Sequence, residues 1–304
     1  MTDASVHIVG AGRVPLRIWL VAARPRTLPA AIAPVIVGTS LAGSEDVFRP
    51  LAFLAALIGS IFIQIGTNLS NDYSDAQRGA DTEDRLGPLR VTASGLVAPR
   101  QVLLATWLAF GVAVAAGVYL IALVGWEILL VGAASILAGV LYTGGPRPYG
   151  YEGLGELFVF LFFGLVAVVG SYYVQTEHLR ALAFGLALPV GLLAAAILMV
   201  NNVRDIETDR RAGKRTVAVR LGRLRARRLY AATIALAFLV TIVIVVTSGK
   251  PWMLLALLAA PMGPPLLRTV GTRTDGPSLN AALAGTGRLL AVFAVLLSVG
   301  ILLS

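Results

Sequence analysis

The chain has 304 residues, of which 57% are hydrophobic and 13% charged, and its mean hydropathy is +0.83. Soluble domains carry about 45–50% apolar and about 25% charged residues, so this composition excludes a water-soluble enzyme. The net charge is +9, and the absence of cysteine excludes disulfides and thiolate chemistry.

Nine apolar runs follow one another along the chain, and we interpret each as a membrane-spanning helix. A span needs about 20 apolar residues, so the shorter runs must borrow from their flanks or line the bundle interior. The runs cover residues 27–42, 51–70, 102–124, 128–142, 154–174, 181–200, 229–247, 252–267 and 281–303. They predict an all-α, polytopic membrane protein of nine transmembrane helices that forms a single domain over 1–304.

The distribution of basic residues predicts the orientation of the chain. If the N-terminus is cytoplasmic, every basic residue except Arg49, Arg180 and Lys250 falls in a cytoplasmic segment. Cytoplasmic loops of membrane proteins carry such an excess of Lys and Arg. We therefore expect a multi-pass protein of the bacterial plasma membrane with its C-terminus outside. The same distribution explains the net charge without nucleic acid as a partner.

Two acidic motifs end the second and the sixth apolar runs. Their sequences are NLSNDYSDAQRGAD and VNNVRDIETDRRAGKRT. Because four spans separate the motifs, both reach the same face of the membrane. This arrangement is also consistent with a parallel duplication of a four-helix unit.

Each motif places one asparagine and two aspartates three or four residues apart, on one face of a helix. The two columns are Asn68, Asp72 and Asp75, and Asn201, Asp205 and Asp209. Closely stacked carboxylates repel one another unless a cation lies between them, and hard oxygen ligands suit Mg²⁺. The four aspartates therefore predict a magnesium site for a diphosphate. The alternative is that they are solvated loop acids, although ionisable groups at membrane depth are functional by default.

Basic residues near the two columns are candidates for binding the diphosphate. They are Arg78, Arg85, Lys214 and Arg215. Arginine forks match phosphate oxygens, and lysine adds a point charge. The alternative role is as topology markers, which we favour for the arginines of 220–228.

Two other segments are unusual. The connection YTGGPRPYGYEGLGE contains Tyr142 and Arg147, and it is either a tight turn or a lid that meets the substrate. The segment ARPRTLPAA places Arg24 at the membrane edge, where arginine either extends towards water or binds an acidic substrate.

These motifs resemble those of the UbiA superfamily of intramembrane aromatic prenyltransferases. NDYSD followed by GAD, and DIETD followed by GKRT, are similar to its two aspartate-rich motifs. ARPRTLPAAIAPVIVG, YTGGPRP with GLGE, and LNAALAGTGRL resemble the members that prenylate 1,4-dihydroxy-2-naphthoate. Some members carry a further Asp where this chain has Gly79, which leaves Asp81, two residues on, as an additional candidate metal ligand.

The resemblance implies helices around a central cavity and a Mg²⁺-dependent reaction within membrane lipid. A polyprenyl chain would pass from polyprenyl diphosphate to 1,4-dihydroxy-2-naphthoate, with loss of CO₂ and diphosphate, and give demethylmenaquinol in menaquinone biosynthesis. The catalytic residues would be Asp72, Asp75, Asp205, Asp209 and Lys214. Candidates for orienting the acceptor are Arg24, Asn68, Asn71, Tyr142 and Arg147.

Two alternatives remain at this stage. The first is a prenyltransferase of the same superfamily with another acceptor, such as 4-hydroxybenzoate or homogentisate. The second is a cation-coupled transporter. Transporters place their coupling residues near the bilayer midplane, whereas these acids lie at helix ends, which favours the enzyme.

Overall fold

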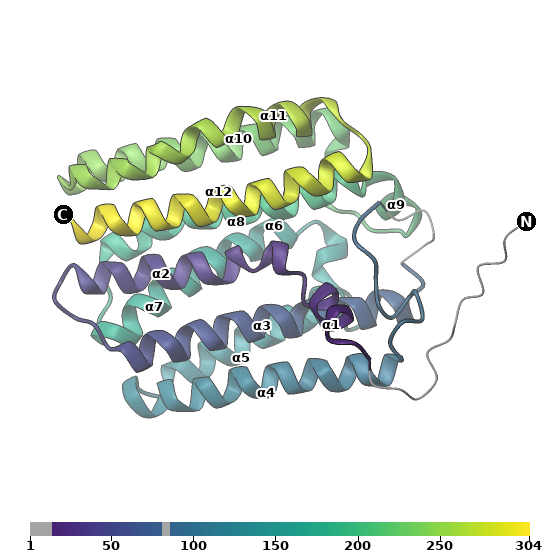
Figure 1. The fold of residues 1–304 in the computed structure, drawn as a ribbon, viewed down its shortest axis with the longest axis horizontal. Coiled ribbons are helices and arrows are strands. Elements are labelled where there is room, and N and C mark those ends of the chain that lie inside the picture. Colours follow the sequence, from purple (N-terminus) through teal and green to yellow (C-terminus); the bar gives the residue numbers. More distant parts are fainter. Residues whose placement is uncertain (1–13, 81–85) are drawn as a thin grey trace, which may run out of the picture.

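The computed structural model describes residues 14–80 and 86–304, and every regular element in these ranges is helical. Figure 1 shows the long helices side by side in one bundle, with α1 and α9 at the same end. The elements are α1 (Leu16–Ala23), η1 (Pro25–Thr27), α2 (Pro29–Gly43), α3 (Pro50–Gln77), α4 (Pro99–Val124), α5 (Glu127–Leu141), η2 (Tyr149–Glu152), α6 (Gly155–Val159), the π-helix η3 (Phe160–Val166), α7 (Ala167–Thr176), α8 (Ala181–Arg204), α9 (Ile206–Arg211), α10 (Val217–Ser248), η4 (Pro251–Met262), α11 (Gly263–Thr272) and α12 (Gly276–Leu302). Arg85 and Asp81 lie outside the described residues.

The all-α membrane fold predicted from the sequence is confirmed. In the described part of the chain, seven helices are long and apolar enough to cross a membrane, including the composite Gly155–Thr176 and Pro251–Thr272. An eighth is formed if α1–η1 and α2 count as one span that is bent by 55° at the break between them. The predicted count of nine further requires α5, which has only 15 residues, so this number stays a prediction.

Two helices extend well beyond the apolar runs that predicted them. α3 continues to Gln77, so Asn68, Asp72 and Asp75 lie on one helix. α10 begins at Val217, well before the predicted start at 229, and contains a break at Gly222, whose φ is 73°. Apolarity marks only the membrane part of a helix, whereas arginine-rich segments such as 223–228 are themselves good helix formers.

α8 lies at the centre of the bundle. Of its most apolar window, 72% is buried inside the protein, against 22% for α3 and for α4. Glycines allow η3 to pack closely on it: a Cβ added to Gly164 would lie 2.8 Å from the Gly191 Cα. The second acidic motif begins in the last turn of α8. The close packing of α8 therefore fixes the position of its first residues.

Candidate active site

One cavity of about 340 Å³ lies between α2, α3, α4, α5, the α6–η3–α7 segment and α8. Its wall along α3 extends from Asp75 to Ala56, which is about 28 Å at 1.5 Å per residue. The charged residues of the lining all come from one end of the bundle. They are Arg24, Asp75, Arg90, Asp205, Asp209 and Lys214. The cavity therefore joins a charged end to a long interior, most of whose apolar lining comes from the elements that face α3.

Asp75 is the carboxylate on which the charged end converges. Its Oδ2 accepts a hydrogen bond from Arg90 Nη2 at 3.0 Å. Its Oδ1 accepts from the Tyr151 hydroxyl at 2.6 Å and from Lys214 Nζ at 3.2 Å. The Lys214 ammonium also lies 4.6 Å from the centre of the Tyr151 ring. Segments far apart in the sequence thus meet at one side chain that is 1% exposed.

Asp72 holds the loop that carries Arg90. Its two oxygens accept backbone N–H bonds from Val91 at 3.1 Å and Thr92 at 2.9 Å. The side chain is buried, and it is not among the described residues that line the cavity. A carboxylate oxygen that accepts one hydrogen bond keeps a second lone pair. The role of Asp72 as a metal ligand therefore stays a prediction.

The sequence predicts that the second acidic motif forms one continuous helical face, but the helix is broken within the motif. α8 ends at Arg204, and Asp205 has φ −94° and ψ 9° before α9 begins. Nevertheless Asn201, Asp205 and Asp209 all line the cavity. The break turns the chain at the middle residue while keeping the three side chains on the same chamber.

Arg204 is a fully buried partner of this motif. Its Nε and Nη2 donate to the two oxygens of Asp205 at 2.8 and 2.6 Å. Its remaining donors reach Asn280 Oδ1 and Asn201 Oδ1, both at 2.7 Å. Because a buried charge requires a partner, Arg204 fixes the orientation of the Asp205 carboxylate and ties α8 to α12.

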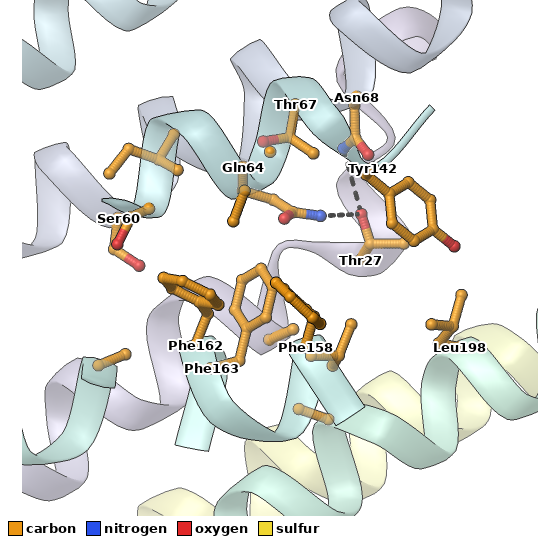
Figure 2. A pocket seen from close by; sticks show the side chains of 18 of the residues that line it. Thr27, Ser60, Gln64, Thr67, Asn68, Tyr142, Phe158, Phe162, Phe163 and Leu198 are labelled. Carbon is orange, nitrogen blue, oxygen red and sulfur yellow. Dashed lines mark hydrogen bonds between the residues drawn. The ribbon is translucent and has the colours of Figure 1, made fainter. Parts of the chain in front are cut away.

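A neutral polar network lies further along the cavity. Thr27 Oγ1 accepts from Gln64 Nε2 at 3.1 Å and from Asn68 Nδ2 at 3.4 Å. Figure 2 shows this network on one wall, with Phe158, Phe162 and Phe163 on the opposite wall. The cavity therefore offers both hydrogen-bonding groups and aromatic faces beside its charged end.

The remaining predicted residues divide into two groups. Arg24, Asn71 and Tyr142 line the cavity, and Asn71 Oδ1 accepts from the Thr143 hydroxyl at 2.8 Å. Arg24 has a φ of 54°, which is uncommon outside glycine and bends the chain between α1 and η1. In contrast, three exposed residues lie outside the described lining. These are Arg78, Arg147 and Arg215.

Besides Arg204, sequence reasoning missed four residues at this site. From the sequence Arg90 is only one of the cytoplasmic basic residues, and Tyr151 lies in a loop where the sequence indicates only Tyr142 and Arg147 as candidates. Asn202 and Glu156 were not selected either, although Asn202 lines the cavity and donates to Glu156 Oε1 at 2.9 Å. For Glu156 the sequence does contain a signal, since it is an acidic residue at the start of the apolar run 154–174.

The donor atoms around the charged end fit Mg²⁺ in kind. In the described part of the chain no three acidic or histidine side chains gather closely enough to hold a metal by themselves. Mg²⁺, however, is usually bound through one or two carboxylates together with water and substrate phosphates. Asp75, Asp205 and Asp209 supply carboxylates of this kind around one chamber.

Comparison with known proteins agrees with this architecture. The sequence model of the UbiA prenyltransferase family matches residues 31–284. The chain belongs to the UbiA prenyltransferase family. It is similar to the 1,4-dihydroxy-2-naphthoate octaprenyltransferases of Mycobacterium tuberculosis and Escherichia coli. The first is 42% identical over 91% of this chain and 94% of the relative, and the second is 40% identical over 94% and 95%.

A solved member of the family shares the fold at low sequence identity. The UbiA homolog from Archaeoglobus fulgidus, bound to DMAPP and Mg²⁺, has a TM-score of 0.66 at 15% identity and covers 93% of this chain and 98% of its own. The transporter alternative is set aside, because the family model and the relatives at 40–42% identity identify a prenyltransferase.

Proposed function

We propose that this chain transfers a polyprenyl chain from polyprenyl diphosphate to 1,4-dihydroxy-2-naphthoate, releasing diphosphate and CO₂ to give demethylmenaquinol for menaquinone biosynthesis. The observation that carries the proposal is the cavity itself, which has a charged end, extends about 28 Å along α3 and is lined by aromatic and apolar residues on the facing α6–η3 segment. The acceptor is supported by the relatives, several of which are named for octaprenyl transfer to this naphthoate. The proposal treats residues 1–304 as one prenyltransferase domain.

The shape of the cavity suits the prenyl donor. An amphiphile with a diphosphate head and a hydrocarbon tail needs charge at one end and apolar contact along its length. The wall along α3 covers most of a hydrocarbon core about 30 Å thick. The tail would therefore lie beside η3 and α5, with the head between α3, α8 and α9.

The chain's cations would receive the diphosphate. Lys214 and Arg90 line the charged end, and both now bind Asp75. When a diphosphate arrives, these two side chains can donate to its oxygens, since cationic donors form strong hydrogen bonds to phosphate. Arg78 and Arg215 are exposed nearby and would act on the approaching anion.

Mg²⁺ would be held by Asp75, Asp205 and Asp209, with Asp72 as a further ligand, and when bound it stabilises the negative charge of the departing diphosphate. The apolar wall of the cavity excludes water from the allylic carbon that the diphosphate leaves. The ring carbon that carries the carboxylate then forms the new C–C bond, and that carboxylate leaves as CO₂. Arg24, Asn68, Asn71 and Tyr142 would orient the ring, and Arg147 would close over the entrance.

The proposal includes the site of action. We place the protein in the bacterial plasma membrane with the N-terminus cytoplasmic and the C-terminus outside, because this orientation puts nearly all basic residues on the cytoplasmic side. The charged end of the cavity then faces the cytoplasm, where a water-soluble naphthoate is available.

An acceptor competition with the purified protein tests the proposal. Dihydroxynaphthoate and 4-hydroxybenzoate are offered together with a polyprenyl diphosphate and Mg²⁺, and prenylated products and CO₂ are quantified. We expect prenylated naphthoquinol with an equal amount of CO₂. Prenylated hydroxybenzoate without CO₂ would keep the prenyl transfer and overturn the acceptor.

A further inference from the structure

Glu156 is a buried acid that the proposed reaction does not use. It lies in the first turn of α6 and is 9% exposed. Asn202 Nδ2 donates to its Oε1 at 2.9 Å, and its Oε2 has no hydrogen-bond partner in the described part of the chain. Burying a carboxyl group with an unsatisfied oxygen costs free energy. Ionisable groups at membrane depth are functional by default.

The acid determines which way the Asn202 amide points. A carboxylate only accepts hydrogen bonds, so the NH₂ group of Asn202 must turn towards Glu156 and the amide oxygen must turn away. Asn202 lines the cavity, and within the described residues no donor reaches its Oδ1. The pair therefore presents a hydrogen-bond acceptor to whatever occupies the cavity.

The surroundings of this acceptor suit a planar ring with a hydroxyl group. Tyr142, Leu198 and Phe158 line the same cavity. Leu198 and Tyr142 pack closely on Gly155, the residue before Glu156, since a Cβ added to this glycine would lie 3.0 Å from Leu198 and 3.2 Å from the Tyr142 ring. An anionic diphosphate oxygen would be repelled by an amide oxygen with a carboxylate behind it. An O–H donor would be attracted.

We infer that Glu156 and Asn202 form a positioning pair that selects the aromatic acceptor by a hydroxyl group, which donates to Asn202 Oδ1. Asn202 makes the contact, and Glu156 acts through it by fixing the amide. This inference rests on the proposed function and names the group of the acceptor that is recognised. Asp205 lies three residues further along, so the pair would place the ring next to the charged end.

The pair should determine the affinity for the acceptor and leave the affinity for the prenyl donor unchanged. A site built to bind a hydroxyl rejects analogues that lack it, because its own polar group is then left unpaired. We expect Glu156→Met, which cannot orient the amide, to raise KM for dihydroxynaphthoate about 10-fold to 100-fold. KM for polyprenyl diphosphate should stay within about twofold of wild type. Glu152→Met is the matched control, since this glutamate lies on η2 and is exposed.

Two further variants separate orientation from simple packing. Asn202→Asp places two carboxylates against each other and should weaken acceptor binding. Adding Glu156→Gln to it restores a donor behind an acceptor, because the introduced glutamine amide can donate to the new carboxylate, and should recover most of the loss. Dissociation constants of 1-hydroxy-2-naphthoate and 4-hydroxy-2-naphthoate, measured by equilibrium binding, give a readout independent of turnover. In wild type the analogue that lacks the recognised hydroxyl should bind more weakly than the analogue that keeps it. In Glu156→Met the two analogues should bind with equal affinity.

The outcomes distinguish this inference from the proposed function. If wild type prenylates dihydroxynaphthoate but Glu156→Met behaves like Glu152→Met, the positioning pair is wrong and the function stands. If Glu156→Met raises both KM values equally, Glu156 is structural and the inference is again overturned. If wild type does not prenylate dihydroxynaphthoate at all, the proposed function is wrong and the inference fails with it.

Discussion

At the scale of single residues, Asp75 joins three polar or charged partners at the site. Arg90, Tyr151 and Lys214 all bind its carboxylate. Each of these partners comes from a different segment of the chain, so the spacing of the acidic motif does not predict this arrangement. Asp75 therefore positions Arg90 and Lys214, and under the proposed function these two cations bind the diphosphate while Asp75 also supplies a carboxylate for the metal.

We expect Asp75→Asn to lower kcat about 100-fold to 1,000-fold, the range found when one preorganised electrostatic group is removed from a site. The neutral side chain would hold Arg90 and Lys214 less firmly and would bind metal poorly. Steady-state kinetics in purified detergent-solubilised protein measure the effect. Glu207→Gln is the control, because Glu207 belongs to the other acidic motif but is exposed, and its kcat should stay near wild type. Equal losses in both variants would contradict the role of Asp75.

The buried Arg204 gives a prediction about stability. Removing one partner of a buried ion pair leaves the other charge uncompensated, which costs about 3–5 kcal/mol. We therefore expect Arg204→Met to reduce the free energy of unfolding by about this amount, because Asp205 would lose both of its charged hydrogen bonds. Thermal or denaturant unfolding followed by circular dichroism provides the measurement. Arg210→Met, which breaks an exposed pair with Glu207, should change stability by less than about 1 kcal/mol.

At the scale of elements, the contact between η3 and α8 shapes the aromatic wall of the cavity. Gly164 and Gly191 allow the two backbones to touch, and η3 then turns Phe162 and Phe163 towards α3 (Figure 2). π-helical turns of this kind occur frequently at functional sites. The position of the wall thus depends on two glycines rather than on the phenylalanines alone.

Gly164→Ala tests that contact. The new Cβ would lie 2.8 Å from the Gly191 Cα and 2.9 Å from the Ala187 carbonyl oxygen. These are backbone atoms and cannot rotate away, so overpacking should destabilise the protein by about 1–3 kcal/mol. Turnover with a long-chain donor should fall with it. Gly111→Ala in α4 is the matched control, since a Cβ there meets nothing within 4 Å. If thermal unfolding showed no difference between the two variants, the close packing of η3 on α8 would be in doubt.

At the scale of the whole molecule, the membrane orientation decides which side supplies the substrates. The chain contains no cysteine, so single cysteines can be introduced and labelled without background. We expect an impermeant maleimide to label Ser304→Cys from outside intact cells. Arg225→Cys, which is exposed on α10, should react only after the cells are permeabilised. The reverse pattern would invert the proposed topology.

Metal removal tests the charged end of the cavity as a unit. Mg²⁺ bound between protein carboxylates and a diphosphate is weakly held by the protein alone. EDTA should therefore abolish prenyl transfer, and excess Mg²⁺ should restore it. Full activity in EDTA would exclude the proposed metal role of Asp75, Asp205 and Asp209.

The fold class, the order of the helices and the family could all be predicted from the amino-acid sequence. Apolar runs, basic loops and the two acidic motifs are local signals, because a membrane imposes length and polarity on each segment separately. The same local signals located Asp75, Asp205, Asp209 and Lys214, all of which line one cavity.

The partners of these residues, in contrast, follow from the way the helices and loops pack. Asp72 binds the loop at Val91 and Thr92, Arg204 holds Asp205, and Glu156 turns Asn202. Each of these contacts depends on how neighbouring segments pack, and residue type and spacing do not encode that packing. The helix break at Asp205 was missed for the same reason, since a buried ion pair and α12 stabilise it rather than any helix-breaking residue.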